Sequence, residues 1–564
     1  MAKVEIPKDQ IAGFECKHAV YSEARDASGN DLVLVKEVIH CKDGRTIPNL
    51  RFIYNYERDF YVTRELYRDH EQKKEWEDLQ KLQKFTCTQA NLTSSVARAL
   101  GRPGARGSLR QLARSPYLYG CDISTPTLIK NWYRKKWPNH ISNNSVAVLD
   151  IETDVVNGDG TEIIYICLSF RERCVLVATK AFLANVHNPI EKLHKKFEQY
   201  LGEYKESRNI DLEVLIADSP GQAVKEVFDR AHQWMPDFVT IWNITFDMPR
   251  IVAALENEGL DPATVLSDPS VPPQFRFYKW KKGPDKQETA SGGIKNIPVA
   301  EQWHLCESAA SFYFMDSMCL YKRIRMAEQN ESSYSLDAQL QKHLGKRKLK
   351  FVEADEYTHL DWHIFMQTHY KIEYGIYNIF DCIGVELFDE KVKDLAQTIT
   401  VQSEHSEYAV FKSQPKRLVD DLHFFAEEHG KVIAACSDQM EEELDKHVLS
   451  MKDWIITLPS HLITDSGLKA IKEVPNLSTL IFTHVADLDV GSGYPTIQRI
   501  LNMSKETTYR ELSRIKGVSE ARQRMAGINI SASHVNAVEV SCELFGAPDF
   551  DALLEAFQEE LAQS

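Results

Sequence analysis

Two carboxylates stand close together at the end of an apolar stretch, in the sequence VAVLDIET at positions 146–153. Side chains of an extended chain alternate between its two faces, so Asp150 and Glu152 are expected on the same face. Neighbouring carboxylates repel each other unless a cation lies between them, and Mg²⁺ prefers oxygen ligands of this kind. The same spacing recurs at Asp211 and Glu213, where we expect ordinary solvated surface. The first pair therefore needs partners from elsewhere in the chain before it indicates a metal site.

Two further acids follow in places where catalytic carboxylates tend to lie. Asp247 comes at a predicted strand-to-helix junction, and Asp381 lies in a long predicted helix near Tyr374 and Tyr377. If the fold brings the four acids together, they could hold two divalent ions about 4 Å apart and support phosphodiester hydrolysis. One ion would make hydroxide available near neutral pH, and the other would stabilise the leaving oxygen. The hydroxyl of Tyr377 would orient the attacking water. Each acid alone is more often surface, so the prediction rests on their joint order.

The composition is that of a globular protein large enough for several domains. The 564 residues are 43% apolar and 26% charged, and no run of about eighteen apolar residues indicates a membrane span. The eleven cysteines contain no Cys-x-x-Cys pair, so we expect reduced thiols in a cytoplasmic compartment. A net charge of −15 argues against nucleic-acid binding over the whole surface but allows a local basic groove.

The apolar pattern predicts a mixed α/β protein. Residues 1 to about 60 indicate short strands with a hairpin turn near 28–30, and 56–84 indicate a charged helix. Strands are expected at 146–150, 162–170 and 174–180, in one sheet. Helices are expected around 190–205 and 220–233, from 335, and over 368–395. Strand-to-helix units are expected at 238–259, 311–325 and 478–503. Residues 268–300 look like a loop, 389–470 look helix-rich with a strand at 454–463, and 501–564 look helical and acidic.

Two basic segments could contact nucleic acid. No acidic residue occurs between Asp78 and Asp122, and arginines recur every fourth residue in that window, where glycines and a proline forbid one continuous helix. These arginines are Arg98, Arg102, Arg106, Arg110 and Arg114. Phosphate contacts and a solvated loop are equally good interpretations. The sequence FRFYKWKK contains Tyr278, Lys279 and Trp280, which could stack on bases and contact phosphates, or could form a plain exposed hairpin.

The order of the acids resembles the three exonuclease motifs of family B DNA polymerases, a branch of the DnaQ-like 3′–5′ exonucleases. Asp-x-Glu is matched at 150–152, and Tyr-x-x-x-Asp is matched at 377–381. Asn-x-x-x-Phe-Asp is resembled by Asn243, Phe246 and Asp247, with one residue fewer between Asn243 and Phe246. The stretches FMDSMCLYKRI and SYSLDAQLQKHLGKRKL are similar to T-even-like phage polymerases. The resemblance covers roughly 140–395. It implies a ribonuclease H-like domain with two Mg²⁺ or Mn²⁺ ions, and substrate contacts from Asn243 and Phe246.

A second resemblance lies nearer the C-terminus. The sequence ADLDVGSGYPTIQRILNMSKET resembles polymerase motif A, with Asp489, Ser492 and Tyr494 in matching positions and Gly493 in place of the family's leucine. The resemblance implies metal binding by Asp489 and substrate binding by Ser492 and Tyr494. The family's Asp-Thr-Asp motif and its fingers motif do not occur in the sequence. We therefore expect four parts: an N-terminal domain (1–140), an exonuclease domain (141–395), a helical connector (396–480) and a partial palm (481–564).

These resemblances imply a proofreading 3′–5′ exonuclease that forms the N-terminal portion of a split family B DNA polymerase. The expected partners are a single-stranded DNA 3′ end or primer-template, a second polypeptide with the remaining palm, fingers and thumb, and other replisome proteins, but no membrane. The expected location is the cytoplasm of a bacterial host or a phage replication compartment. Two alternatives stay open: a free-standing DNA or RNA exonuclease, and a non-catalytic replisome scaffold, which the shortened second motif would favour.

Overall fold

The computed structural model describes residues 6–438 except 72, 105–106, 289–292 and 327–330. The described residues belong to one compact unit, residues 1–447, and the second unit, 448–564, lies outside them. The elements expected at 454–463, 478–503 and 501–564 therefore also lie outside the described part. Within that part, no helix is both long enough and apolar enough to cross a membrane. The division into four domains stays a prediction.

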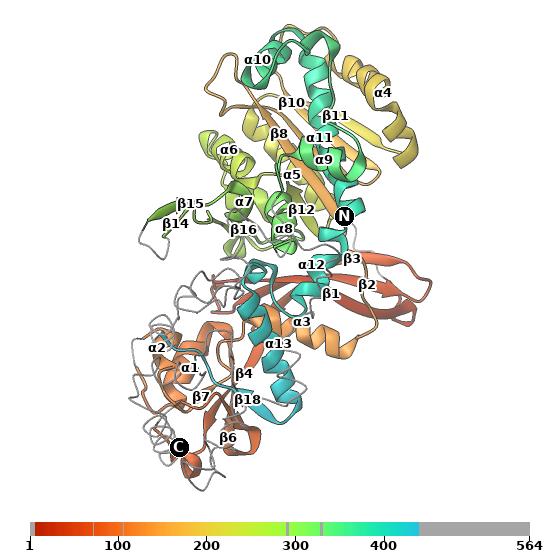
Figure 1. Ribbon diagram of the computed structural model, residues 1–564. Coiled ribbons are helices and arrows are strands. Elements are labelled where there is room, and N and C mark those ends of the chain that lie inside the picture. The colour runs from red at the N-terminus through yellow and green to blue at the C-terminus, as the bar shows by residue number, and fades with distance from the viewer. Residues whose placement is uncertain (1–5, 72, 105–106, 289–292, 327–330, 439–564) are drawn as a thin grey trace, which may run out of the picture. The chain divides into compact units, whose positions relative to one another are not determined.

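A six-stranded mixed sheet carries the first acidic pair (Figure 1). Its strands, in spatial order, are β11 (Asp211–Ala217), β10 (Arg173–Thr179), β9 (Ile163–Phe170), β8 (Val146–Thr153), β12 (Phe238–Ile241) and β17 (Tyr313–Asp316). Strands β8, β12 and β17 run parallel, and β9 is antiparallel to both of its neighbours. Almost every side chain of β8, β9 and β10 is buried, which explains why their sequences are continuously apolar. The prediction of three strands in one sheet is confirmed.

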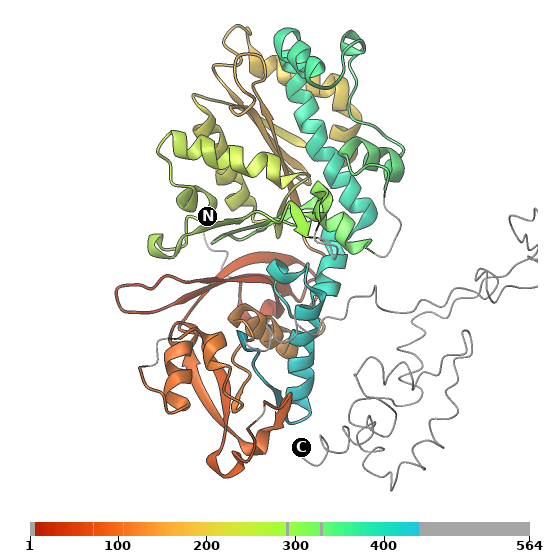
Figure 2. The same ribbon diagram turned by 60° about the vertical axis from the view of Figure 1, so that its left-hand side comes forward.

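Helices cover both faces of this sheet (Figures 1 and 2). On one face the apolar core is shared with α4 (Pro189–Arg208), α9 (Leu336–Leu344) and α11 (Lys371–Val392), and on the other with α5 (Pro220–Trp234) and α6 (Ile244–Asn257). Along β8, Val148 belongs to the α11 side, whereas Ala147 and Leu149 belong to the α5 side. The alternation of side chains therefore turns Asp150 and Glu152 toward α11.

Residues 11–54 form strands, as predicted, and these pair in a separate antiparallel sheet. Strands β1 (Ile11–Ser22), β2 (Leu32–Cys41) and β3 (Thr46–Tyr54) pair in chain order, and α3 (Thr125–Lys136) packs against β1. The predicted hairpin turn is confirmed, with Gly29 in the left-handed region at φ 82°. A glycine adopts this conformation without the steric penalty of a side chain.

The predicted charged helix at 56–84 is wrong. Strand β4 (Glu57–Thr63) pairs with β6 (Leu82–Thr88) and β7 (Leu118–Tyr119), and β5 (Trp76–Asp78) pairs with β18 (Lys431–Ile433). On one face of β4, Arg58, Phe60 and Val62 are almost completely buried, with at most 2% exposure. This alternation, together with a partner strand about 350 residues away, outweighs the helical preference of the Glu- and Lys-rich run.

The remaining elements lie outside the six-stranded and N-terminal sheets. Two separate helices, α1 (Leu92–Ala99) and α2 (Leu109–Leu112), occupy the arginine-rich window, so the prediction that no continuous helix forms there is confirmed. The segment expected as a loop at 268–300 contains strands instead, because β13 (Tyr278–Lys281) pairs with β16 (Leu305–Ser308), and β14 (Lys286–Glu288) pairs with β15 (Ile294–Asn296). The other helices are α7 (Pro262–Leu266), α8 (Ser317–Ile324), α10 (His359–His369), α12 (Ile399–Ser403) and α13 (Gln414–Glu428).

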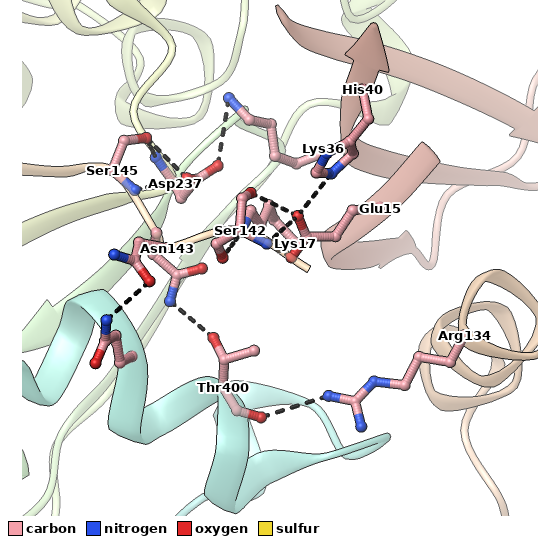
Figure 3. Close-up of polar contacts among 12 residues, drawn as sticks. Glu15, Lys17, Lys36, His40, Arg134, Ser142, Asn143, Ser145, Asp237 and Thr400 are labelled. Carbon is pink, nitrogen blue, oxygen red and sulfur yellow. Dashed lines mark hydrogen bonds and ion pairs between the residues drawn. The ribbon is translucent and has the colours of Figure 1, made fainter. Parts of the chain in front are cut away.

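The segment 142–145, just before β8, is held by polar contacts with the N-terminal sheet and the β12 entry (Figure 3). The backbone N–H and hydroxyl of Ser145 each donate to Asp237 Oδ2 at 2.7 Å, and the Nζ of the fully buried Lys36 lies 3.8 Å from Asp237 Oδ1. Ser142 donates from its N–H and hydroxyl to Glu15 Oε2, at 3.0 and 2.6 Å. These contacts fix where β8 begins, and so fix the register of the acids at its end.

Candidate functional site

Three parallel strands end at one edge of the sheet, and an acidic residue lies at or just after the end of each. Asp150 lies near the end of β8, Asp247 lies in the first turn of α6 after β12, and Asp316 ends β17. The carboxylate of Asp316 accepts hydrogen bonds from Cys319 N at 2.7 Å and from Ile244 N at 3.0 Å. Asp316 therefore caps α8 and fixes the start of α6, which positions Asp247 next to β8.

Asp150, Glu152 and Asp381 converge on one point. Each of the three offers a carboxylate oxygen, and these oxygens lie within 4.8 Å of one another. The third acid comes from α11, which also supplies hydrogen bonds to the first two. Asn378 Nδ2 donates to Asp150 Oδ2 at 2.7 Å, and the hydroxyl of Tyr374 donates to Glu152 Oε2. The side chains predicted from two distant segments thus meet, because α11 packs across β8.

Asp247 lies beside these three acids. It comes from α6, on the face of the sheet opposite α11. Its Oδ1 accepts a hydrogen bond from the backbone N–H of Ile151 at 3.2 Å, and only 3% of the residue is exposed. Burial and the charge of Asp150 raise the pKa of Asp247 well above its usual value. The charges of Asp150 and Glu152 therefore act on the fourth predicted carboxylate.

The four acids repel one another in a buried place. Burial, and then the charge of Asp381, raises the pKa of Asp150 to about 7. Burial and Asp150 raise the pKa of Glu152 well above its usual value, and burial also raises the pKa of Asp381. The buried Oδ1 of Asp381 has no hydrogen-bond partner among the described residues. A carboxylate oxygen left without a donor, within a converging acidic group, fits a bound metal ion.

Lys348 contacts both Asp381 and Tyr377. The ammonium group of Lys348 lies 2.5 Å from Asp381 Oδ2 and donates to the Tyr377 hydroxyl at 2.9 Å. Burial opposes the charge on Lys348, but Asp381 and Tyr377 raise its pKa well above the usual value. The ring of Tyr377 stacks on Tyr374, with centroids 6.0 Å apart and planes 5° from parallel. Lys348 therefore stays charged and holds the tyrosine hydroxyl beside the acids.

The second motif adopts a compact turn at the start of α6. Asn243 precedes the helix, and its Oδ1 accepts a hydrogen bond from the Thr245 hydroxyl at 2.7 Å. The ring of Phe246 is 40% exposed, and the Arg250 guanidinium lies 3.8 Å from its centroid. The shortened spacing thus keeps Asp247 beside β8, leaves Phe246 at the surface and turns the Asn243 side chain onto its own turn.

The basic segments lie outside the acidic group. Arg98, Arg102 and Arg110 are exposed on α1, α2 and their connection, Arg114 binds Asp438 with two hydrogen bonds of 2.8 Å, and Arg106 lies outside the described residues. Tyr278 and Trp280 point into the α5–α6 core, while Lys279 pairs with Glu23. Pairing of β13 with β16 explains this alternation. The nucleic-acid role of both segments stays a prediction, and Asp489, Ser492 and Tyr494 lie outside the described part.

Several functional candidates had little or no signal in the sequence. Lys348 comes from the connection between α9 and α10; it lies within the stretch 333–349 that resembles phage polymerases, but none of the three exonuclease motifs contains it. Asn378 could have been found, because it lies one turn before Asp381 on the same helix. A second group, Glu404, His405 and Asp421, could also hold a metal ion, and no motif indicated it. The control pair behaves as expected: Asp211 and Glu213 are exposed, and Glu213 pairs with Arg230.

No protein-family model matches the chain, and no curated protein matches it.

Proposed function

We propose that this chain is a metal-dependent 3′–5′ exonuclease with a ribonuclease H-like (DnaQ-like) fold, using two Mg²⁺ or Mn²⁺ ions. The observation that carries the proposal is the convergence of Asp150, Glu152 and Asp381 on one point, with Asp247 held against the neighbouring backbone. Carboxylates arranged in this way suit a two-ion phosphodiesterase. The mixed sheet, with helices on both faces and acids at the ends of its parallel strands, supports the same reading.

The residues have separable tasks in this proposal. Asp150, Glu152, Asp247 and Asp381 would hold the ions, which supply hydroxide near neutral pH and stabilise charge on the leaving oxygen. The Tyr377 hydroxyl, fixed by Lys348, orients the attacking water for in-line approach. The exposed ring of Phe246, next to Asp247, offers a stacking surface for the base at the 3′ end.

We further propose that the exonuclease is the N-terminal portion of a split family B DNA polymerase located in the cytoplasm. The support is the motif A-like sequence with Asp489 and Tyr494, whose aspartate would contribute one carboxylate to a palm. Polymerisation by two metal ions needs carboxylates from separate strands, which in this proposal a second polypeptide supplies. The chain alone would then degrade DNA 3′ ends but add no nucleotides.

The proposal is tested with the full-length chain and a 5′-labelled single-stranded oligonucleotide. With Mg²⁺ we expect a ladder that shortens from the 3′ end, no nucleotide addition, and loss of the ladder in Asp150→Ala. Asp211→Ala is the matched control, because it alters the same kind of acidic pair on the exposed face of the edge strand β11. Equal activity in Asp150→Ala and the wild-type protein would show that the nuclease activity comes from elsewhere, and no hydrolysis by the wild-type protein would favour the scaffold alternative.

A further inference from the structure

A basic cavity of about 360 Å³ lies beside α8. None of the four acids of the candidate site (Asp150, Glu152, Asp247 and Asp381) lines it. Among the described residues, its lining includes Trp303, Lys322, Arg323 and Lys412, together with apolar side chains, Gln287 and one acid, Glu301. Three cationic side chains thus face one carboxylate, in a chain whose net charge is −15. The volume is within the range of sites that bind small organic ligands.

The cations of this cavity are held close to one another and to further basic groups. Arg323 donates to the backbone oxygen of Lys412, so the two residues are adjacent. Lys322 is only 8% exposed, and its Nζ lies 3.9 Å from Glu301 Oε1. After burial, the charges of Lys282 and Lys412 are the main causes that lower the pKa of His304 to about 4. The local field is therefore positive and favours an anionic ligand.

An aromatic wall accompanies the cations. The ring of Trp303 stacks on Phe411, with centroids 5.8 Å apart and planes 24° from parallel, and the Arg417 guanidinium lies 4.6 Å from the centroid of Phe411. Trp303 is partly exposed and lines the cavity. Since Phe411 belongs to a buried apolar cluster, the Trp303 ring is supported from behind. A fixed indole ring next to phosphate-binding cations is the combination that single-stranded nucleic acids and nucleotides use.

We propose that this cavity binds one nucleotide unit, with its phosphate on Arg323 and Lys412 and its base against Trp303. The unit could come from a free nucleotide or from a DNA strand, because both present the same phosphate and base. The proposal does not depend on hydrolysis at Asp150. The cavity is nevertheless tied to that site, because Asp316 caps α8 and its carboxylate also accepts a hydrogen bond from the first N–H of α6.

The test measures binding by the full-length chain in EDTA, where metal-dependent hydrolysis cannot occur. Fluorescence anisotropy of a labelled oligothymidylate is followed over a salt series. Lys412→Glu is expected to weaken binding about tenfold. It should also reduce the slope of the logarithm of the binding constant against the logarithm of salt concentration by about 1, the contribution of one phosphate contact. Lys180→Glu is the control, because Lys180 is a 71% exposed lysine outside the cavity that pairs only with the exposed Asp218. Thermal melting checks that both variants are folded.

Two further measurements locate the ligand and distinguish its sources. An oligonucleotide containing 5-iodouracil is irradiated, and the cross-linked peptide is expected to contain Trp303. Thymidine monophosphate that competes with an affinity equal to that of the oligonucleotide assigns the cavity to free nucleotides, and competition only at far higher concentration assigns it to a strand. Unchanged affinity in both Lys412→Glu and Arg323→Ala, or cross-links only outside the cavity, would overturn the proposal. Inorganic phosphate that competes as well as thymidine monophosphate would overturn the role of Trp303. Failure of the exonuclease proposal would change none of these readouts.

Discussion

Replacing Lys348 by alanine should disturb the positions of Asp381 and Tyr377 while leaving the overall fold unchanged. The Lys348 ammonium lies 2.5 Å from Asp381 and 2.9 Å from the Tyr377 hydroxyl, so the substitution removes the contact that positions both groups. Hydrogen bonds that involve a charged group contribute about 1.5–3 kcal/mol. If the tyrosine hydroxyl orients water in the transition state, a loss of this size lowers kcat by roughly 10- to 150-fold.

The assay is single-turnover release of nucleotides from a 5′-labelled single-stranded oligonucleotide at saturating Mg²⁺. Lys346→Ala is the matched control, because Lys346 lies two residues away, is exposed and contacts the hydroxyl and ring of Tyr204 rather than the acids. We expect Lys346→Ala to keep wild-type activity. Activity of Lys348→Ala within about twofold of the wild-type protein, or an equal loss in Lys346→Ala, would refute the positioning role of Lys348.

Three other predictions concern the same part of the chain. Tyr374→Phe removes the buried hydroxyl that binds Glu152 and His363, and should lower activity about tenfold and stability by about 1–3 kcal/mol, as measured by calorimetry. Asp150 has its pKa raised from 3.8 to about 7, so the metal-free protein should lose up to about 4 kcal/mol of stability as the pH rises from about 4 to about 7. Mg²⁺ should restore that stability, and urea unfolding that shows no pH dependence in EDTA would contradict this. Asp237→Ala leaves the buried Lys36 without its carboxylate and should cost about 3–5 kcal/mol in the same unfolding measurement.

Much of the sheet and its flanking helices could be predicted because their signals are local. The continuous apolar runs of β9 and β10 indicate buried strands, and Asp316 follows its strand and caps the helix that the sequence pattern predicts. The segment 56–84 could not be predicted in this way. Its charged residues favour a helix locally, whereas β5 gains its partner strand from residues 431–433, which no local pattern reveals.

The candidate site shows the same contrast. The four acids could be named because each has a position within a strand, a junction or a helix that the sequence itself indicates. Lys348 could not be named, because it reaches Asp381 from a connection without regular spacing. This lysine also affects how the site could bind a metal ion. It binds Oδ2 of Asp381, while Oδ1 has no hydrogen-bond donor among the described residues. Geometry of this kind arises only when distant segments pack together.

Anomalous diffraction from crystals soaked in Mn²⁺ shows whether Asp150, Glu152 and Asp381 hold divalent metal ions. We expect a Mn²⁺ peak within about 2.0–2.3 Å of carboxylate oxygens from these residues, and loss of the peak in Asp150→Ala. The Asp381 oxygen without a hydrogen-bond partner among the described residues is expected to be one of the ligands. Ordered carboxylates with no peak between them at saturating Mn²⁺ would show that these residues do not form a metal site.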